Sequence, residues 1–144
     1  GGNAMVSDEL KSSFAMDIVM MKYIGINPII VHGGGPQIGD MLEKLNIKTR
    51  FIDGYRITDE KVLEVVEMVL AGKVNKEIVG LINSFGGRAV GISGKDAMLI
   101  NAEKLEYDME LGFVGKVKAV NPDILIILSE GGFIPVVAPV GINE

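Results

Sequence analysis

The chain has 144 residues, enough for one domain, and its 48% apolar and 23% charged residues are the balance of a globular protein that can build a hydrophobic core. Its formal net charge of −5 argues against a nucleic-acid-binding surface, which would carry clustered Lys and Arg. The absence of cysteine excludes disulfides and thiolate metal sites, and a single histidine argues against a histidine-based zinc site.

The first predicted helix begins after Ser7, a good N-cap residue, and ends at Gly25. Apolar residues recur at helical spacing between these positions, which predicts one buried face: Leu10, Phe14, Ile18 and Met21. The residues before this helix, Gly1 to Met5, have the composition of a loop at the end of a strand. We therefore expect a strand before Gly1.

Three consecutive glycines, Gly33 to Gly35, follow an apolar strand predicted over residues 28–31 and precede a helical pattern that starts at Pro36. A ligand can approach a backbone without Cβ atoms closely, and the free N–H groups of a helix start favour an anion. The turn therefore predicts an anion-binding site. The alternative is a glycine turn that only lets the helix pack closely on the sheet. The residue pattern of this turn does not match the dinucleotide-binding fingerprint or the oxyanion loop of esterases.

Asp53-Gly54 is a strong signal for a two-residue β-hairpin turn, with strands predicted over residues 47–52 and 55–57. Arg56 lies just past the turn, on the second strand, at the rim of the fold.

Two helical patterns follow the hairpin and run to Phe85, with Thr58 as the predicted cap of the first. Gly72 is expected to interrupt the helix between them. The first helix has an apolar stripe that we expect to be buried: Val62, Val66, Val69 and Leu70.

The last part of the chain alternates strands with one short helix, which starts at Asn121-Pro122. Strands are predicted over residues 88–92, 97–100, 113–119 and 134–138. Alternating helices and continuously apolar strands predict an α/β fold with a mainly parallel sheet covered on both faces. Ligands of such sheets lie beyond the carboxyl ends of the strands.

The motifs, in this order, resemble those of the amino acid kinase family, and within it the kinases that act on N-acetyl-L-glutamate. They cover residues 1–5, 31–38, 53–59, 66–76, 111–115 and 134–139. The resemblance implies a three-layer α/β/α sandwich with an amino-terminal lobe for the acyl-amino acid and a carboxy-terminal lobe for the nucleotide. Residues 1–144 would be most of the substrate-binding lobe, and we expect the nucleotide lobe to be absent from the chain.

The resemblance also implies phosphorylation of the side-chain carboxylate of N-acetyl-L-glutamate by ATP with Mg²⁺, a step of arginine biosynthesis. By resemblance, Gly34 and Gly35 bind the substrate, Arg56 pairs with its α-carboxylate, and Gly1 and Gly2 belong to the loop that faces the transferring phosphoryl group. The two lysines that the family uses in catalysis are not in the chain. Because this transfer depends on charge neutralisation, we expect these residues to be inactive alone.

Simpler roles are open for several of these residues. Arg56 could be a solvated hairpin charge, and His32 is more typical of a hydrogen-bonded strand end than of a catalyst. Asp59 and Glu60 suit the dipole of the following helix, and Lys95 and Asp96 have no assigned role.

Two other functions are also open: a non-catalytic module that binds an acyl-amino acid, and a related kinase with another carboxylate or carbamate substrate. No apolar run reaches the roughly 20 residues that span a bilayer, and no signal peptide opens the chain. We expect a cytoplasmic homo-oligomer with no nucleic-acid or membrane partner.

Overall fold

Three strands form a parallel sheet at the centre of the computed structural model, which describes residues 7–143. The sheet order is β1 (Ile30–Val31), β7 (Ile134–Ala138) and β4 (Ala89–Ser93), with β7 in the middle. Every residue of β7 is buried, as expected for a central strand covered on both faces. The predicted parallel sheet is confirmed, although β1 is shorter than expected.

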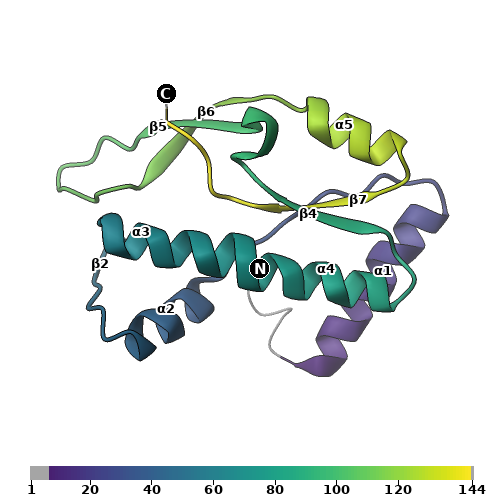
Figure 1. Ribbon diagram of the computed structural model, residues 1–144, viewed down its shortest axis with the longest axis horizontal. Helices are drawn as coiled ribbons and strands as arrows, with labels where there is room; N and C mark the ends of the chain where they lie inside the picture. Colours follow the sequence, from purple (N-terminus) through teal and green to yellow (C-terminus); the bar gives the residue numbers. More distant parts are fainter. Residues whose placement is uncertain (1–6, 144) are drawn as a thin grey trace.

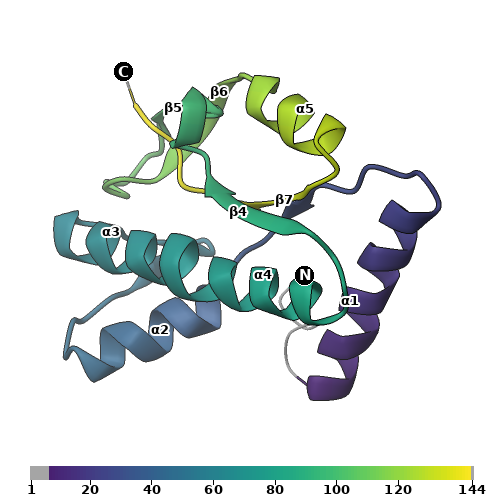
Figure 2. The same cartoon turned by 45° about the vertical axis from the view of Figure 1, so that its right-hand side comes forward.

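Helices cover both faces of this sheet (Figure 1). One face carries α1 (Asp8–Tyr23) and a long helical run made of α3 (Glu60–Glu67), η2 (Met68–Val74) and α4 (Asn75–Ser84), with α2 (Gly35–Lys44) beside it. Figure 2 shows α5 (Asp123–Glu130) on the opposite face. The three-layer α/β/α arrangement agrees with the prediction.

Two antiparallel strand pairs lie outside the parallel sheet. The pair of β2 (Phe51–Ile52) and β3 (Tyr55–Arg56) closes through Asp53 and Gly54, both with positive φ, at 48° and 86°. This is the predicted two-residue hairpin, because its turn needs left-handed backbone at both positions. β5 (Ile100–Lys104) pairs with β6 (Gly115–Val120), and β6 is exposed along its whole length.

The main hydrophobic core fills the layer between the sheet and the long helical run. Its most buried members include Leu42 of α2, Val62 of α3, Ile82 of α4 and Val136 of β7. The predicted stripe of α1 is only partly right: Ile18 is buried and Phe14 packs against the core, but Leu10 and Met21 are exposed, and Ala15 is buried instead.

Two helix caps can be compared with the prediction. Ser7 caps α1 as expected, since its side chain accepts a hydrogen bond from the backbone N–H of Leu10. Thr58 does not cap α3. Asp59 does so instead, with Oδ1 accepting from the N–H of Val62 at 2.9 Å, because the hydroxyl of Thr58 donates to the carbonyl of Arg56.

Gly72 does not interrupt the long helix. It lies within η2, a π-helical segment that joins α3 to α4 without a break. The wider turn moves the buried face by part of a turn, so that Val74 and Asn75 are both buried against the sheet. The sequence pattern could not show this, because a 3.6-residue period assumes α-helix throughout.

The strand predicted over residues 97–100 is also wrong, since β5 starts only at Ile100. Ala97 and Met98 have φ of 49° and 54° and belong to the short 3₁₀ segment η3 (Asp96–Met98). The carboxylate of Asp96 accepts hydrogen bonds from the backbone N–H and the hydroxyl of Ser93, which closes a tight loop in place of a strand. Similarly, β6 begins two residues after the predicted start at Phe113.

The junction between β3 and α3 is tied to the segment before β6. Thr58 donates its N–H to the carbonyl of Leu111 at 2.9 Å and accepts from the N–H of Phe113 at 2.7 Å. Gly112 lies between these two bonds with φ of 73°, so close to Thr58 that an added Cβ would overlap its carbonyl oxygen. Glycine is therefore required here by packing and by backbone conformation.

Candidate functional site

The loops that follow β1, β4 and β7 gather at the carboxyl edge of the parallel sheet. His32 leaves β1 and donates its N–H to the carbonyl of Val137, while Gly94 leaves β4 and donates to the carbonyl of Ala138. The glycine turn of residues 33–35 starts at this edge and runs into α2, with Pro36 in the first turn of the helix. The strand, turn and helix predicted around it are confirmed.

The three glycines of this turn differ in what surrounds them. A Cβ on Gly34 would lie 2.8 Å from Cδ2 of Leu70 and 3.2 Å from Cγ2 of Val74, so Gly34 lets the turn pack on η2. A Cβ on Gly33 or Gly35 would meet nothing within 4 Å. Packing therefore explains one glycine, while the other two border open space that a ligand can enter.

The backbone donors of the turn have no partner in the described part of the chain. Within residues 7–143, no acceptor lies against the N–H groups of Gly33, Gly34 or Gly35. Such N–H groups at the start of α2 form a site for an anion, and the helix dipole adds to it.

Arg56 lies against this turn although it is 21 residues away from Gly35 in the sequence. Its Nη2 donates to the carbonyl of Gly35 at 3.2 Å, and its guanidinium lies over the ring of Phe51, 4.5 Å from the ring centre. Partial burial lowers the pKa of Arg56 from its ordinary value by desolvation, yet an arginine stays cationic at neutral pH. The hairpin thus places a fixed positive charge against the carbonyl of Gly35, in the first turn of α2.

Gln37 and Asn75 were not singled out by the sequence reasoning. Oε1 of Gln37 is buried without a hydrogen-bond partner among the described residues. The side chain of Asn75 is completely buried and contacts Nε2 of His32 at 3.1 Å. His32 is hydrogen-bonded at both ring nitrogens, as predicted for a strand-end residue. The signal available for Asn75 was a polar residue on an otherwise apolar helical face.

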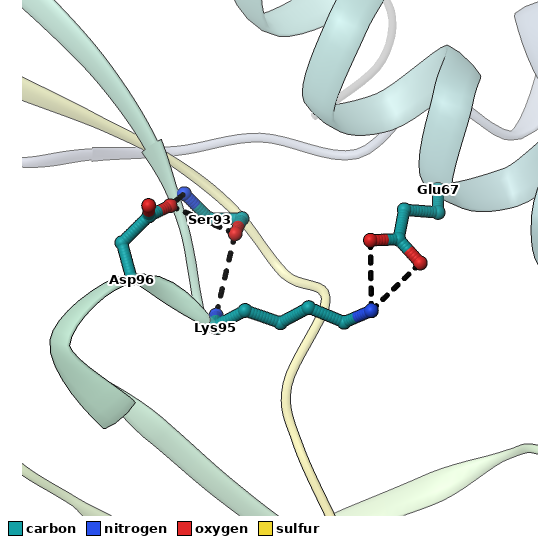
Figure 3. A network of polar contacts seen from close by, with 4 residues as sticks. All are labelled: Glu67, Ser93, Lys95 and Asp96. Carbon is teal, nitrogen blue, oxygen red and sulfur yellow. Dashed lines mark hydrogen bonds and ion pairs between the residues drawn. The ribbon is translucent and has the colours of Figure 1, made fainter.

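Lys95 and Asp96 do not pair with each other (Figure 3). Both carboxylate oxygens of Glu67 accept from Nζ of Lys95 at 2.7 Å, while Asp96 accepts from Ser93. The side chains of Lys95 and Glu67 are 43% and 40% exposed, so the ion pair adds little stability and connects the loop after β4 to the end of α3.

A cavity of about 690 Å³ lies between α3, the β5–β6 hairpin and residues 139–143. Its wall is mostly apolar and includes Leu63, Val66 and Val114, with Lys95 among its polar members. Gly34, Gly35 and Arg56 do not line it. The predicted site residues therefore form a separate, open group.

The loop between β5 and β6 contacts the hairpin that carries Arg56. The hydroxyl of Tyr107 donates to Asp53, and this bond, with some desolvation, raises the pKa of the Tyr107 hydroxyl. The rings of Tyr107 and Tyr55 meet edge to face, 5.7 Å between centres. On the same loop, a hydrogen bond from Lys104 lowers the pKa of Glu110. This loop supports the turn of the hairpin from outside.

Two of the predicted site residues lie outside the described part of the chain. Gly1 and Gly2 fall outside residues 7–143. Within that range, no three or more His, Cys, Asp or Glu side chains come together in a way that could hold a metal ion. In the same part of the chain, no helix combines the length and the apolar character needed to cross a membrane.

Comparison with known sequences finds relatives that share one name. The acetylglutamate kinase of Carboxydothermus hydrogenoformans is 60% identical over an alignment 152 residues long. The alignment covers 99% of this chain and 52% of that protein. The acetylglutamate kinase of Syntrophus aciditrophicus is 58% identical and is also covered to 52%. The chain thus spans about half the length of the curated relatives it matches.

Solved structures share the fold. The protein smu.665 from Streptococcus mutans UA159 superposes with a TM-score of 0.85 at 25% identity, over 97% of this chain and 55% of that one. N-acetylglutamate synthase from Neisseria gonorrhoeae, solved with coenzyme A and N-acetyl-glutamate, gives 0.78 at 19% identity over 99% of this chain and 32% of that one, a likeness of fold alone. The model of the amino acid kinase family matches this chain over residues 1–144. The chain therefore belongs to the amino acid kinase family.

Proposed function

We propose that this chain binds N-acetyl-L-glutamate as the substrate-binding lobe of an acetylglutamate kinase, which transfers a phosphoryl group from ATP to the side-chain carboxylate of that substrate. The observation that carries the proposal is the contact between Arg56 and Gly35. It brings a guanidinium to the first turn of α2, whose leading N–H groups have no partner among the described residues. Relatives named acetylglutamate kinase at 58–60% identity support this substrate.

The substrate has two carboxylates, and the site has two separate sets of donors. The planar guanidinium of Arg56 suits bidentate binding of the α-carboxylate. The N–H groups of Gly34 and Gly35 would bind oxygens of the side-chain carboxylate and hold it in place for the transfer. Each charge-assisted hydrogen bond of this kind contributes about 1.5–3 kcal/mol.

ATP and Mg²⁺ belong to the proposed reaction of the whole enzyme. The described residues do not fit a protein-built Mg²⁺ site, because no cluster of metal ligands occurs among them. Gly1 and Gly2 remain proposed members of the loop that faces the phosphoryl group. A cytoplasmic location and self-association likewise stay predictions.

The proposal is tested by titrating the chain calorimetrically with N-acetyl-L-glutamate and, separately, with unacetylated L-glutamate. We expect saturable binding of the acetylated compound and weaker binding of glutamate. A chain with a folded circular dichroism spectrum that binds neither compound would contradict the assignment of the substrate site to these residues.

Replacing Gly35 with alanine separates ligand binding from stability. The new Cβ would face open space in the free chain, so the free energy of unfolding should change by less than about 0.5 kcal/mol. In the complex it would occupy the ligand's approach to the backbone, and affinity for N-acetyl-L-glutamate should fall about tenfold or more, the cost of one charge-assisted bond. Calorimetry and urea unfolding measure the two effects.

The matched control for this variant is Gly80→Ala. Gly80 is an exposed glycine in α4 with open space around it, and its replacement should leave the affinity unchanged. Equal affinities for the parent, Gly35→Ala and Gly80→Ala would remove the glycine turn from the proposed site.

A further inference from the structure

The side chain of Asn75 contacts two strands of the parallel sheet and the residue that follows the third. Its Nδ2 lies 3.1 Å from Nε2 of His32, 3.0 Å from the carbonyl oxygen of Val136 and 3.4 Å from that of Ile92. Its Oδ1 accepts from Nζ of Lys76 at 2.9 Å. His32 directly follows β1, Val136 lies in β7 and Ile92 in β4. A completely buried amide thus connects the strands at the edge where the glycine turn begins.

These partners determine which way the amide points. Carbonyl oxygens only accept hydrogen bonds and an ammonium group only donates, so the NH₂ group must face Val136 and Ile92, and Oδ1 must face Lys76. The NH₂ group has two hydrogens, and its two shorter contacts are with Val136 and His32. Nε2 of His32 is therefore an acceptor and carries no proton.

The other ring nitrogen of His32 leads to the same assignment. Nδ1 lies 3.0 Å from the carbonyl oxygen of Gly33, which can only accept. A neutral imidazole with an accepting Nε2 has its proton on Nδ1, so it donates to Gly33. Both contacts are satisfied by one tautomer, and the opposite tautomer would satisfy neither.

This tautomer also orients the glycine turn. The carbonyl of Gly33 and the N–H of Gly34 belong to one trans peptide unit and point in opposite directions. With the carbonyl held by Nδ1–H of His32, the N–H of Gly34 is turned away from the imidazole. Gly91 of β4 makes room for this arrangement, because an added Cβ there would overlap Oδ1 of Asn75.

We propose that Asn75 is a positioning residue that holds His32 in the Nδ1–H tautomer and, through it, fixes the orientation of the Gly33–Gly34 peptide. The tautomer and the peptide orientation are properties of the free chain. Their effect on the binding of N-acetyl-L-glutamate rests on the proposed function. The tautomer and the binding are therefore measured separately.

The tautomer is read from the ¹⁵N-labelled chain by long-range ¹H–¹⁵N correlation NMR in alkaline buffer. The sequence has a single histidine, so the ring signals need no assignment. We expect Nδ1 at the chemical shift of a protonated nitrogen and Nε2 at that of an unprotonated one. A protonated Nε2 in the parent chain would overturn the proposal before any variant is made.

Two variants test whether Asn75 is the cause. Asn75→Asp places an accepting carboxylate oxygen against Nε2, so Nε2 should become protonated and the backbone amide signal of Gly34 should move. Asn75→Ala removes the donor and leaves only the bond to Gly33 to favour Nδ1–H, so the Nε2–H form should appear there in part. A folded variant of either kind whose His32 and Gly34 signals match the parent would overturn the proposal.

Asn83→Asp is the matched control, because Asn83 also lies on α4 and also contacts β4. Its Oδ1 accepts from the N–H of Ala89 at 2.7 Å, at the opposite end of that strand from the site. This variant should retain the parent signals of His32. If both asparagines had only a structural role, Asn75→Asp and Asn83→Asp would both affect stability, and neither would change the tautomer of His32.

Calorimetry with N-acetyl-L-glutamate then measures the effect on the ligand. Folded Asn75→Asp should bind about tenfold more weakly than the parent, as expected for one misoriented hydrogen bond, and Asn83→Asp should bind normally. Normal binding by an Asn75→Asp chain with the inverted tautomer would refute the positioning role. If the parent itself does not bind, the proposed function fails, while the NMR result still decides the tautomer.

Discussion

Replacing Arg56 with alanine is expected to lower the affinity for N-acetyl-L-glutamate by more than about a hundredfold, which corresponds to roughly 3 kcal/mol, the loss of two charge-assisted hydrogen bonds. The guanidinium already lies over Phe51 and against Gly35 in the free chain, so little ordering is needed when a carboxylate binds. Calorimetric titration of parent and variant measures the difference.

Arg56→Lys tests the geometry of the charge. A lysine keeps the positive charge but has no planar fork, so we expect it to recover only part of the affinity. Arg88→Ala is the control, because Arg88 also lies over an aromatic ring, that of Phe133, at 4.3 Å, but at the amino end of β4. Equal losses in the Arg56 and Arg88 variants would mean that the effect is not local to the site.

Replacing Gly112 with alanine is expected to lower the free energy of unfolding by about 3 kcal/mol or more. A left-handed conformation costs a residue with a Cβ about 1–2 kcal/mol, and Gly112 has φ of 73°. The Cβ would also overlap the carbonyl oxygen of Thr58, which weakens the two backbone bonds beside it, each contributing about 0.5–1.5 kcal/mol. Urea unfolding monitored by circular dichroism measures the loss.

Gly25→Ala separates the two causes. Gly25 also has positive φ, at 91°, but an added Cβ there would meet nothing within 4 Å. Its replacement should therefore cost only the conformational part, about 1–2 kcal/mol. If Gly112→Ala were no more destabilising than Gly25→Ala, the close approach of Gly112 to Thr58 would not contribute to stability.

Local sequence patterns predicted those elements whose structure is determined by their own residues. Ser7 caps α1, Asp53-Gly54 forms the hairpin turn, and the apolar run of β7 is buried, because capping, left-handed backbone and continuous hydrophobicity are properties of a few neighbouring residues. The errors arose where a residue had a choice of partner. Thr58 could cap α3 but bonds to Arg56 instead, which leaves the cap to Asp59.

The residues of the candidate site also divide into those that the sequence could predict and those that it could not. Gly34, Gly35 and Arg56 could be proposed from the glycine turn, from the hairpin and from the resemblance of their motifs to a family. Asn75 could not, since a polar residue on an apolar face is compatible with many roles until its partners are known. The roles of Lys95 and Asp96 also depended on Glu67 and Ser93, which the sequence does not pair with them.

By itself, the sequence determined the α/β class, the positions of most helices and turns, and the family, because each of these depends on short patterns or on their order along the chain. Only the tertiary structure decided that Arg56 lies against Gly35, that η2 turns Asn75 toward the sheet, and that Asn75 binds His32. The contacts of Arg56 with Gly35 and of Asn75 with His32 join residues 21 and 43 positions apart. The packing of helices on the sheet creates them, and no local pattern encodes which distant backbone a side chain will meet.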